Sequence, residues 1–313
     1  MRVMNDKEER KEPIEIDLLA VISQGFLCSL GMATFIMSPL PIIHSHLKLL
    51  NPWPKVATLL GAVLAIAVLE LPVMPVVLSF VVGIFLADNY INEMPFWKNF
   101  SGTVLVGTLI AAGALLLNAS LEKVSVFTYW SQVVGGFITL AQESVKLTDS
   151  SVQWGDLKEV LIYQGPFFFI STCILLFWFN VGLAAHLGWV SDTHPYSSRS
   201  LRGLKFPQFF GLLFVVLFAL NAAHLGQVHH LISGLFRIVG TILFMQGMVT
   251  LSTALSIKGT KRTTRALVYF FSCTVAFYAV IGLGVLSPWF FKNKGNRLDN
   301  VPVVKLEEVS VWR

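Results

Sequence analysis

Six of the polar side chains within or at the ends of long apolar runs are candidate site residues, and three of these six have the chemistry to bind charge. Arg237 and Asp88 are ionisable, and Asn92 follows Asp88 by one helical turn. An ionisable group in hydrocarbon costs about 2.5 to 3.5 kcal/mol on insertion scales, so each needs a partner. We expect Arg237 to bind an anionic ligand or to pair with Asp88, and Asp88 with Asn92 to coordinate a headgroup or a cation. More often, such an arginine extends to the membrane interface and carboxylates at a helix end are solvated.

The other three side chains are amides in separate apolar runs of the second half of the chain: Asn180, Asn221 and Gln246. A side-chain amide without a hydrogen-bond partner in hydrocarbon costs several kcal/mol, so all three are predicted to face the interior of a helix bundle. They would then line one ligand site with Arg237 at its mouth. The alternative, at least as good, is that they join helices by hydrogen bonds worth about 0.6 kcal/mol each.

No motif in the chain indicates catalysis or a metal site. Histidines lie near the ends of apolar runs, at His44, His46, His224, His229 and His230. A zinc site needs three or four ligands in fixed geometry, and neither an HExxH motif nor a cysteine partner is present. Nucleophile-elbow, phosphate-loop, dinucleotide and paired-aspartate motifs are also missing. Cys28, Cys173 and Cys273 lie inside apolar runs and are expected to be small buried hydrophobic residues. We therefore expect that the protein is not an enzyme and that it binds neither a cofactor nor a metal.

The composition is that of an integral membrane protein. Of the 313 residues, 55% are hydrophobic and 13% are charged, and the mean hydropathy is +0.69. A soluble domain carries about 25% charged residues. The net charge of +5 comes from basic residues scattered singly through loops. This pattern favours contact with anionic lipid and argues against nucleic acid as a partner.

Stretches between consecutive charged residues locate the elements that must position the polar groups. A transmembrane helix needs about 20 mostly apolar residues, and this rule gives eight spans, with seven as the main alternative. They lie near residues 18–43, 54–70, 72–92, 100–119, 166–190, 207–223, 230–257 and 266–291. Polar segments 1–17 and 292–313 flank this transmembrane domain. The long first apolar run and its acidic head favour an uncleaved span over a signal peptide. The predicted fold is an all-α polytopic transmembrane helix bundle with both termini in the cytoplasm.

Residues 121–164 are predicted to lie along the membrane surface. Apolar side chains recur there at helical spacing opposite glutamine and glutamate, which is typical of an interfacial amphipathic helix. Trp130 and Phe137 are expected to face lipid. A second short helix is expected from Asp156, and Pro166 is expected to open the fifth span at its first position.

The second half of the chain resembles the YybS-like family of bacterial membrane proteins, which share a domain of unknown function. The resemblance rests on GPFFFISTCILLFWFNVGLAAHLGW, LRGLKFPQFFGLLF, ILFMQGMVTL and AVIGLGVLSPWFF, together with MSPLP near the N-terminus. The matching positions are Pro39, Pro41, Pro166, Trp178, Asn180, Arg202, Phe206, Pro207, Gln246, Gly247, Gly282, Trp289 and Phe291. The chain departs from the family at Ser287-Pro288, where an aspartate is usual.

That family is regarded as similar in fold to the substrate-binding subunits of energy-coupling-factor transporters. The resemblance implies a helical bundle around a small-molecule pocket, working with a separate energising partner in the bacterial cytoplasmic membrane. By this analogy, we expect a ligand-binding, transport-related protein. The alternative is a scaffold or assembly protein that docks other envelope proteins and transports nothing.

Overall fold

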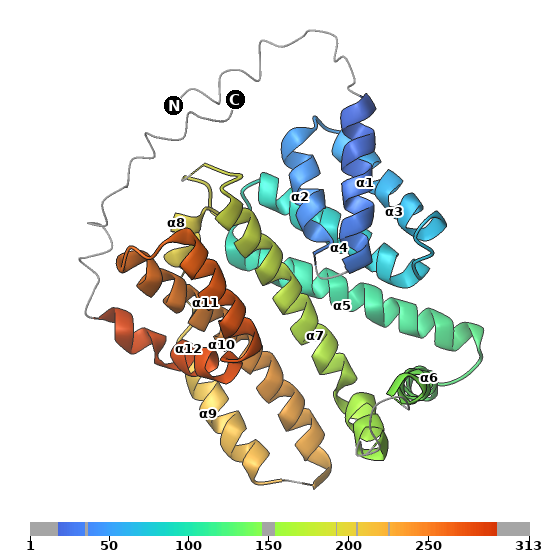
Figure 1. Cartoon of the computed structure of the whole chain (residues 1–313). Coiled ribbons are helices and arrows are strands. Elements are labelled where there is room, and N and C mark those ends of the chain that lie inside the picture. The colour runs from blue at the N-terminus through green and yellow to red at the C-terminus, as the bar shows by residue number, and fades with distance from the viewer. Residues whose placement is uncertain are drawn as a thin grey trace. The chain divides into compact units, whose positions relative to one another are not determined.

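The computed structural model describes residues 18–34, 37–145, 154–191, 193–204, 206–224 and 226–292, and within them every regular element is a helix (Figure 1). The helices are α1 (Leu18–Thr34), α2 (Pro39–Lys48), α3 (Trp53–Ala67), α4 (Val73–Ile91), α5 (Phe96–Leu121), α6 (Val126–Val145), α7 (Trp154–Leu187), α8 (Ser198–Arg202), α9 (Phe209–Ala222), the 3₁₀ turn η1 (Gly226–Val228), α10 (His229–Ile257), α11 (Arg262–Thr274) and α12 (Phe277–Lys292). The predicted all-α class is confirmed. The polar segment 1–17 and the tail after residue 292 lie outside the described residues.

Four of the described helices, α4, α5, α7 and α10, are long and apolar enough to cross a bilayer. A fifth span results if α11 and α12, which meet at a bend of 102°, are counted together. The apolar helices α1, α3 and α9 have 17, 15 and 14 residues. At 1.5 Å per residue they reach about 21 to 26 Å, less than the hydrocarbon thickness of about 30 Å. The chain is an integral membrane protein, but length alone supports four or five spans where eight were predicted.

Two of the predicted continuous spans are broken. The helix expected over 18–43 is divided into α1 and α2, because Pro39 lacks the N–H that a helix interior needs and begins α2 instead. The helix expected over 266–291 bends between Thr274 and Phe277. The Thr274 hydroxyl donates to the Phe270 carbonyl at 3.0 Å, and Thr274 and Val275 are both β-branched. Both features weaken a helix, although neither breaks one alone.

The prediction of a separate helix from Asp156 followed by a span from Pro166 is wrong. α7 is one helix of 34 residues with Pro166 inside it. Proline leaves the carbonyl four residues earlier, that of Ile162, without its helical donor. The Trp130 indole N–H of α6 donates to this carbonyl at 2.9 Å. A Cβ on Gly165 would collide with the Trp130 ring, so Gly165 provides the space for the indole. An external donor therefore allows α7 to continue through the proline.

The helix predicted in the 121–164 segment is present as α6, but one of its side chains is oriented differently from the prediction. Trp130 is directed at α7, so its expected lipid contact is wrong. Val134 and Ile138, one and two turns later, are buried on the same face. A second apolar face is exposed, with Phe137 at 60% and Leu140 at 65%. α6 therefore presents one apolar face to protein and another outward.

The chain divides into two compact units. Unit 1 contains α1 to α4, residues 96–110 of α5 and residues 179–189. Its helices α1 and α3 cross at Gly25 and Gly61, where a Cβ on Gly61 would lie 2.7 Å from the Gly25 carbonyl oxygen. Small residues at this crossing let the two backbones approach closely.

Unit 2 contains residues 111–178 and the chain from Val190 onward, and it packs around α10. α10 and α12 cross with their backbones in contact. A Cβ on Gly247 would collide with the Val280 carbonyl, and a Cβ on Gly284 would collide with the Leu243 carbonyl. Because the space is blocked from both sides, neither position has room for a side chain.

Candidate functional site

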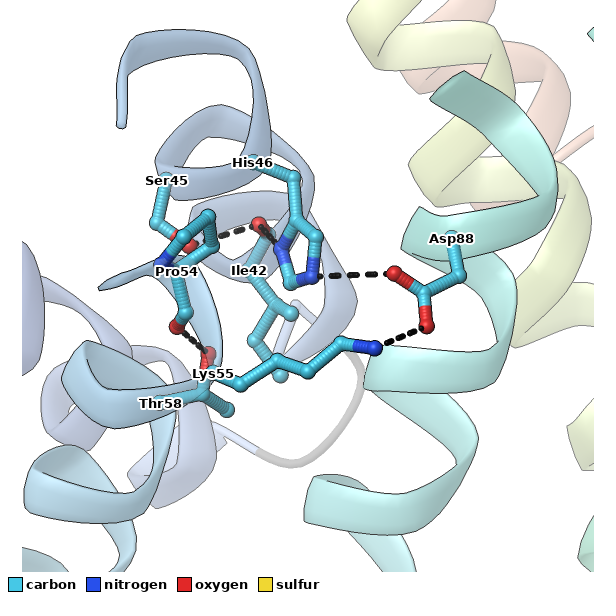
Figure 2. Close-up of polar contacts among 7 residues, drawn as sticks. All are labelled: Ile42, Ser45, His46, Pro54, Lys55, Thr58 and Asp88. Carbon is cyan, nitrogen blue, oxygen red and sulfur yellow. Dashed lines mark hydrogen bonds and ion pairs between the residues drawn. The ribbon is translucent and has the colours of Figure 1, made fainter. Parts of the chain in front are cut away.

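Unit 1 holds an ion cluster built from three helices, which we call the His46 cluster: His46 of α2, Lys55 of α3 and Asp88 of α4 (Figure 2). The two oxygens of the Asp88 carboxylate have different partners. Oδ1 lies 3.4 Å from His46 Nε2, and Oδ2 lies 2.9 Å from Lys55 Nζ. The side chains of His46, Asp88 and Lys55 are 6%, 36% and 46% exposed. The cluster thus runs from a buried imidazole to an accessible ammonium.

The packing of α2 on α4 positions this cluster. Ile42 is fully buried and occupies the space where Gly83 has no side chain. His46 lies one turn after Ile42, on the same face of α2. Asp88 lies five residues, about 7.5 Å, further along α4 than Gly83, and its carboxylate is 3.4 Å from the His46 ring. The Ser45 and Thr58 hydroxyls donate to carbonyls of their own helices and add no charge to the cluster (Figure 2).

The hydrogen bond to the main chain fixes the tautomer of His46. Nδ1 lies 2.8 Å from the Ile42 carbonyl oxygen, which only accepts, so Nδ1 carries a hydrogen. In the neutral ring, Nε2 therefore presents a lone pair to the Asp88 carboxylate. Burial lowers the pKa of His46, since the charged ring loses hydration, and Lys55 lowers it further. The Ile42 carbonyl and the Asp88 carboxylate act in the opposite direction.

A second polar cluster, which is buried, joins α4 to α5 in unit 1. Asn89 donates its amide N–H to Asn99 Oδ1 at 3.2 Å, and the Thr103 hydroxyl donates to the same oxygen at 3.1 Å. Asn92, a predicted site residue, is exposed at the end of α4 and donates its backbone N–H to the Asp88 carbonyl at 3.0 Å. A cation or headgroup at Asp88 and Asn92 remains a prediction.

Arg237 of unit 2 is a cation that has no anionic partner among the described residues. Its guanidinium carbon lies 3.5 Å from the centroid of the Phe168 ring of α7, a cation–π contact. Its Nη1 is buried and has no hydrogen-bond partner among the described residues. The described residues form three ion pairs, and none of them includes Arg237. Asp88, its predicted alternative partner, is paired with Lys55 and His46. Arg237 thus retains N–H groups that an anion would accept from.

The start of α10 brings more titratable groups to the same side of unit 2. His230 Nε2 lies 3.8 Å from Glu159 Oε1 of α7, and its ring stacks on Tyr163 at 4.8 Å between centroids. The centroids of the His229 and His224 rings lie 4.8 Å apart. One turn after His230, Gly234 gives space to Phe167, and Arg237 then follows at Phe168. Because these contacts ascend together along both helices, α7 and α10 run parallel here.

The three amides have different environments. Gln246 is 7% exposed and donates its amide N–H to the Ser287 hydroxyl of α12, which supports the interhelical role for this residue. Asn180 is fully buried on α7 in unit 1. Asn221 is half-buried at the end of α9, and its Oδ1 accepts no hydrogen bond from the described residues. The burial of Asn180 and Gln246 agrees with the predicted interior position, whereas a site shared by all three amides remains a prediction.

The sequence did not reveal the partners in these clusters. Lys55 was not among the predicted site residues, and His46 was considered only as a zinc ligand, because nothing along the chain shows that α2, α3 and α4 meet there. Ser287 attracted attention only as a departure from the resembled family. Within the described residues, no group of three or more His, Cys, Asp or Glu side chains is arranged to hold a metal ion. Comparison of the chain with protein-family models, curated proteins and solved structures found no match.

Proposed function

We propose that this integral membrane protein binds a small anion at Arg237 as part of a transport process. The observation that carries the proposal is a guanidinium inside the apolar helix α10 with a buried, unused nitrogen and no carboxylate partner in the described chain. A charge left in this state is costly, and binding an anion offsets the cost. The planar fork of arginine matches the paired oxygens of a carboxylate or a phosphate.

The resemblance to the YybS-like family supports the same proposal. It suggests a substrate-binding subunit with a separate energising partner in the bacterial cytoplasmic membrane. The parallel α7 and α10, held apart by aromatic side chains at Phe167 and Phe168, supply the walls against which such a ligand would lie.

A scaffold role is the second candidate, and α5 favours it. Only 11% of its most apolar stretch is buried within the chain, so this helix presents apolar side chains such as Leu109 and Leu116 outward. An envelope protein docked on α5 would cover this surface. That role requires no ligand at Arg237, so one binding experiment separates the two candidates.

The experiment measures anion binding to the full chain in lipid nanodiscs by calorimetry, with phosphate, sulfate and short dicarboxylates as probes. We expect at least one probe to bind the wild type and Arg237→Gln to weaken it by about tenfold or more, the value of a lost charged hydrogen bond. Arg237→Lys should bind with intermediate affinity, because it keeps the charge and loses the fork. Arg199→Gln removes an exposed arginine of unit 2 and should bind like the wild type. Equal affinity in Arg237→Gln and the wild type would refute the site.

A further inference from the structure

We propose that His46 is a proton-binding site, and that proton uptake there releases α2 from α4 in unit 1. The ligand is a proton from water. It adds to the lone pair of Nε2, so that the ring becomes a cation and no other bond is made or broken. This inference rests on unit 1 alone and is independent of anion binding at Arg237.

The hydrogen-bond geometry confines the proton to one atom. Nδ1 is already protonated, because it donates to the Ile42 carbonyl at 2.8 Å. The remaining nitrogen, Nε2, is buried, has no hydrogen-bond partner among the described residues, and faces Asp88 Oδ1 at 3.4 Å. Protonation therefore creates a charge at the contact between α2 and α4 while the ring stays fixed to its own helix.

The charges around His46 decide what this new charge does. α4 contributes Asp88 and α3 contributes Lys55, and these two already neutralise each other at 2.9 Å. α1 faces α2 without a charged side chain between Leu18 and Thr34, where Cys28 is the one titratable residue. α2 itself adds His44, which bonds Gln24, and the cation Lys48. A proton on His46 thus makes the cluster net positive with one carboxylate shared by two cations.

A net charge at a side chain that is 6% exposed is more stable in water than in the packed cluster. The route to water is short, because Lys55 and Asp88 are partly exposed at the edge of the same cluster. The protonated ring gains hydration when α2 separates from α4, whereas the neutral ring gains little. The switch therefore holds α2 on α4 at neutral pH and releases it in acid.

The test is hydrogen–deuterium exchange of the full chain in nanodiscs, followed over residues 39–48 and corrected for the intrinsic exchange rate. Below about pH 6.5, the ordinary pKa of histidine, the opening constant should rise by up to about tenfold per pH unit. Residues 239–250 of α10 contain no described ion pair and serve as the internal control. Protection of residues 39–48 that is independent of pH, or lost equally in α10, would overturn the proposal.

Three variants test the assignment to His46. His46→Gln removes the proton site and should make the exchange of α2 independent of pH. Lys55→Gln leaves Asp88 free for the imidazolium and should reduce the acid effect, whereas Asp88→Asn should keep or increase it. Full acid sensitivity in His46→Gln would refute the assignment. If Asp88→Asn does not fold, Lys55→Gln remains decisive, because the proposal requires it to resist acid better than the wild type.

A second measurement checks the tautomer directly. Nitrogen NMR of ¹⁵N-histidine protein, with the His46 signals assigned by their loss in His46→Gln, should show a hydrogen on Nδ1 and none on Nε2 at neutral pH. A neutral ring with the hydrogen on Nε2 would contradict the geometry on which the switch depends.

Discussion

In unit 1 the cation Lys55 lies 2.9 Å from the anion Asp88, whereas in unit 2 the cation Arg237 lies against the Phe168 ring with a nitrogen unused. The Lys55 charge is neutralised by Asp88 inside the chain. A proton on the neighbouring His46 would therefore leave the cluster with a net positive charge. The Arg237 charge is not neutralised among the described residues and is suited to a partner from outside. The same kind of side chain is thus paired inside the chain in one unit, whereas in the other we propose that it binds a ligand.

The two units also differ in how tightly their central helices cross. At Gly61 in unit 1, an added Cβ would lie 2.7 Å from the Cys28 Cβ and from the Gly25 carbonyl oxygen. At Gly247 in unit 2, it would collide with the Val280 carbonyl more severely, and Gly284 repeats the conflict from the other helix. Four predictions test these contrasts, from the largest expected effect to the smallest.

Gly247→Leu should have the largest effect. The side chain would force α10 from α12, and the loss of stability should exceed about 4 kcal/mol, so that little folded protein is recovered. Fluorescence-detected gel filtration of detergent extracts measures the recovery. Gly240→Ala is the matched control in the same helix, because its Cβ would make ordinary contact with Phe214 at 3.5 Å. Normal recovery of Gly247→Leu would show that the crossing is looser than described.

Gly61→Ala should destabilise unit 1 by about 1 to 3 kcal/mol, the range for an overpacked interface. The effect should be smaller than that of Gly247→Leu, since Cys28 and Gly25 need to move less. Thermal unfolding in detergent is the measurement. Gly113→Ala, where an added Cβ would meet nothing within 4 Å, should leave the melting temperature unchanged or slightly higher. Equal shifts in the two variants would contradict the close approach of α1 and α3.

Arg237→Met should stabilise the ligand-free protein by about 1 kcal/mol, because removing an unpaired charge outweighs the lost cation–π contact. Lys55→Met should instead cost up to about 1 kcal/mol, since it removes the partner of Asp88 at a partly exposed site. We therefore predict that the two substitutions change the stability in opposite directions. Melting temperatures without added anions measure both, and a destabilised Arg237→Met would indicate that Arg237 already has a partner.

Gln246→Leu should have the smallest effect, about 0.6 to 1 kcal/mol, by removing one hydrogen bond between α10 and α12. The double variant with Ser287→Ala should recover part of this loss, because no hydroxyl is then left unpaired. A double-mutant cycle by thermal unfolding gives the coupling free energy between the Gln246 and Ser287 side chains. Zero coupling would exclude the bond between Gln246 and Ser287 as a source of stability.

The sequence predicted most of the long helices but not where the chain breaks. The spans expected at 72–92 and 230–257 agree with α4 and α10 within two residues, because uncharged apolar runs of that length form helices. The predictions failed near Pro39, Thr274 and Pro166, where local hydrogen bonding decides the outcome. Averaged hydropathy does not record which donor serves which carbonyl, and at Pro166 that donor comes from a different helix.

The candidate site was also predictable only in part. Arg237 and Asp88 were identifiable because charges are rare and costly in apolar runs. The roles of His46 and Lys55 depend on contacts between α2, α3 and α4, which no spacing along the chain encodes. Individual residues with unusual chemistry were therefore found, while their partners required the fold.

The effect of substituting Trp130 depends on whether residue 166 is proline, and the effect of substituting Pro166 depends on whether residue 130 is tryptophan. If Pro166 were replaced by alanine, a backbone N–H would compete for the Ile162 carbonyl, and the Trp130 indole would no longer be needed as its donor. If Trp130 alone were replaced by phenylalanine, that carbonyl would have no donor. The harm done by either substitution thus depends on the residue at the other position. The two sites form an epistatic pair, and tryptophan at 130 is dispensable only in chains that lack proline at 166.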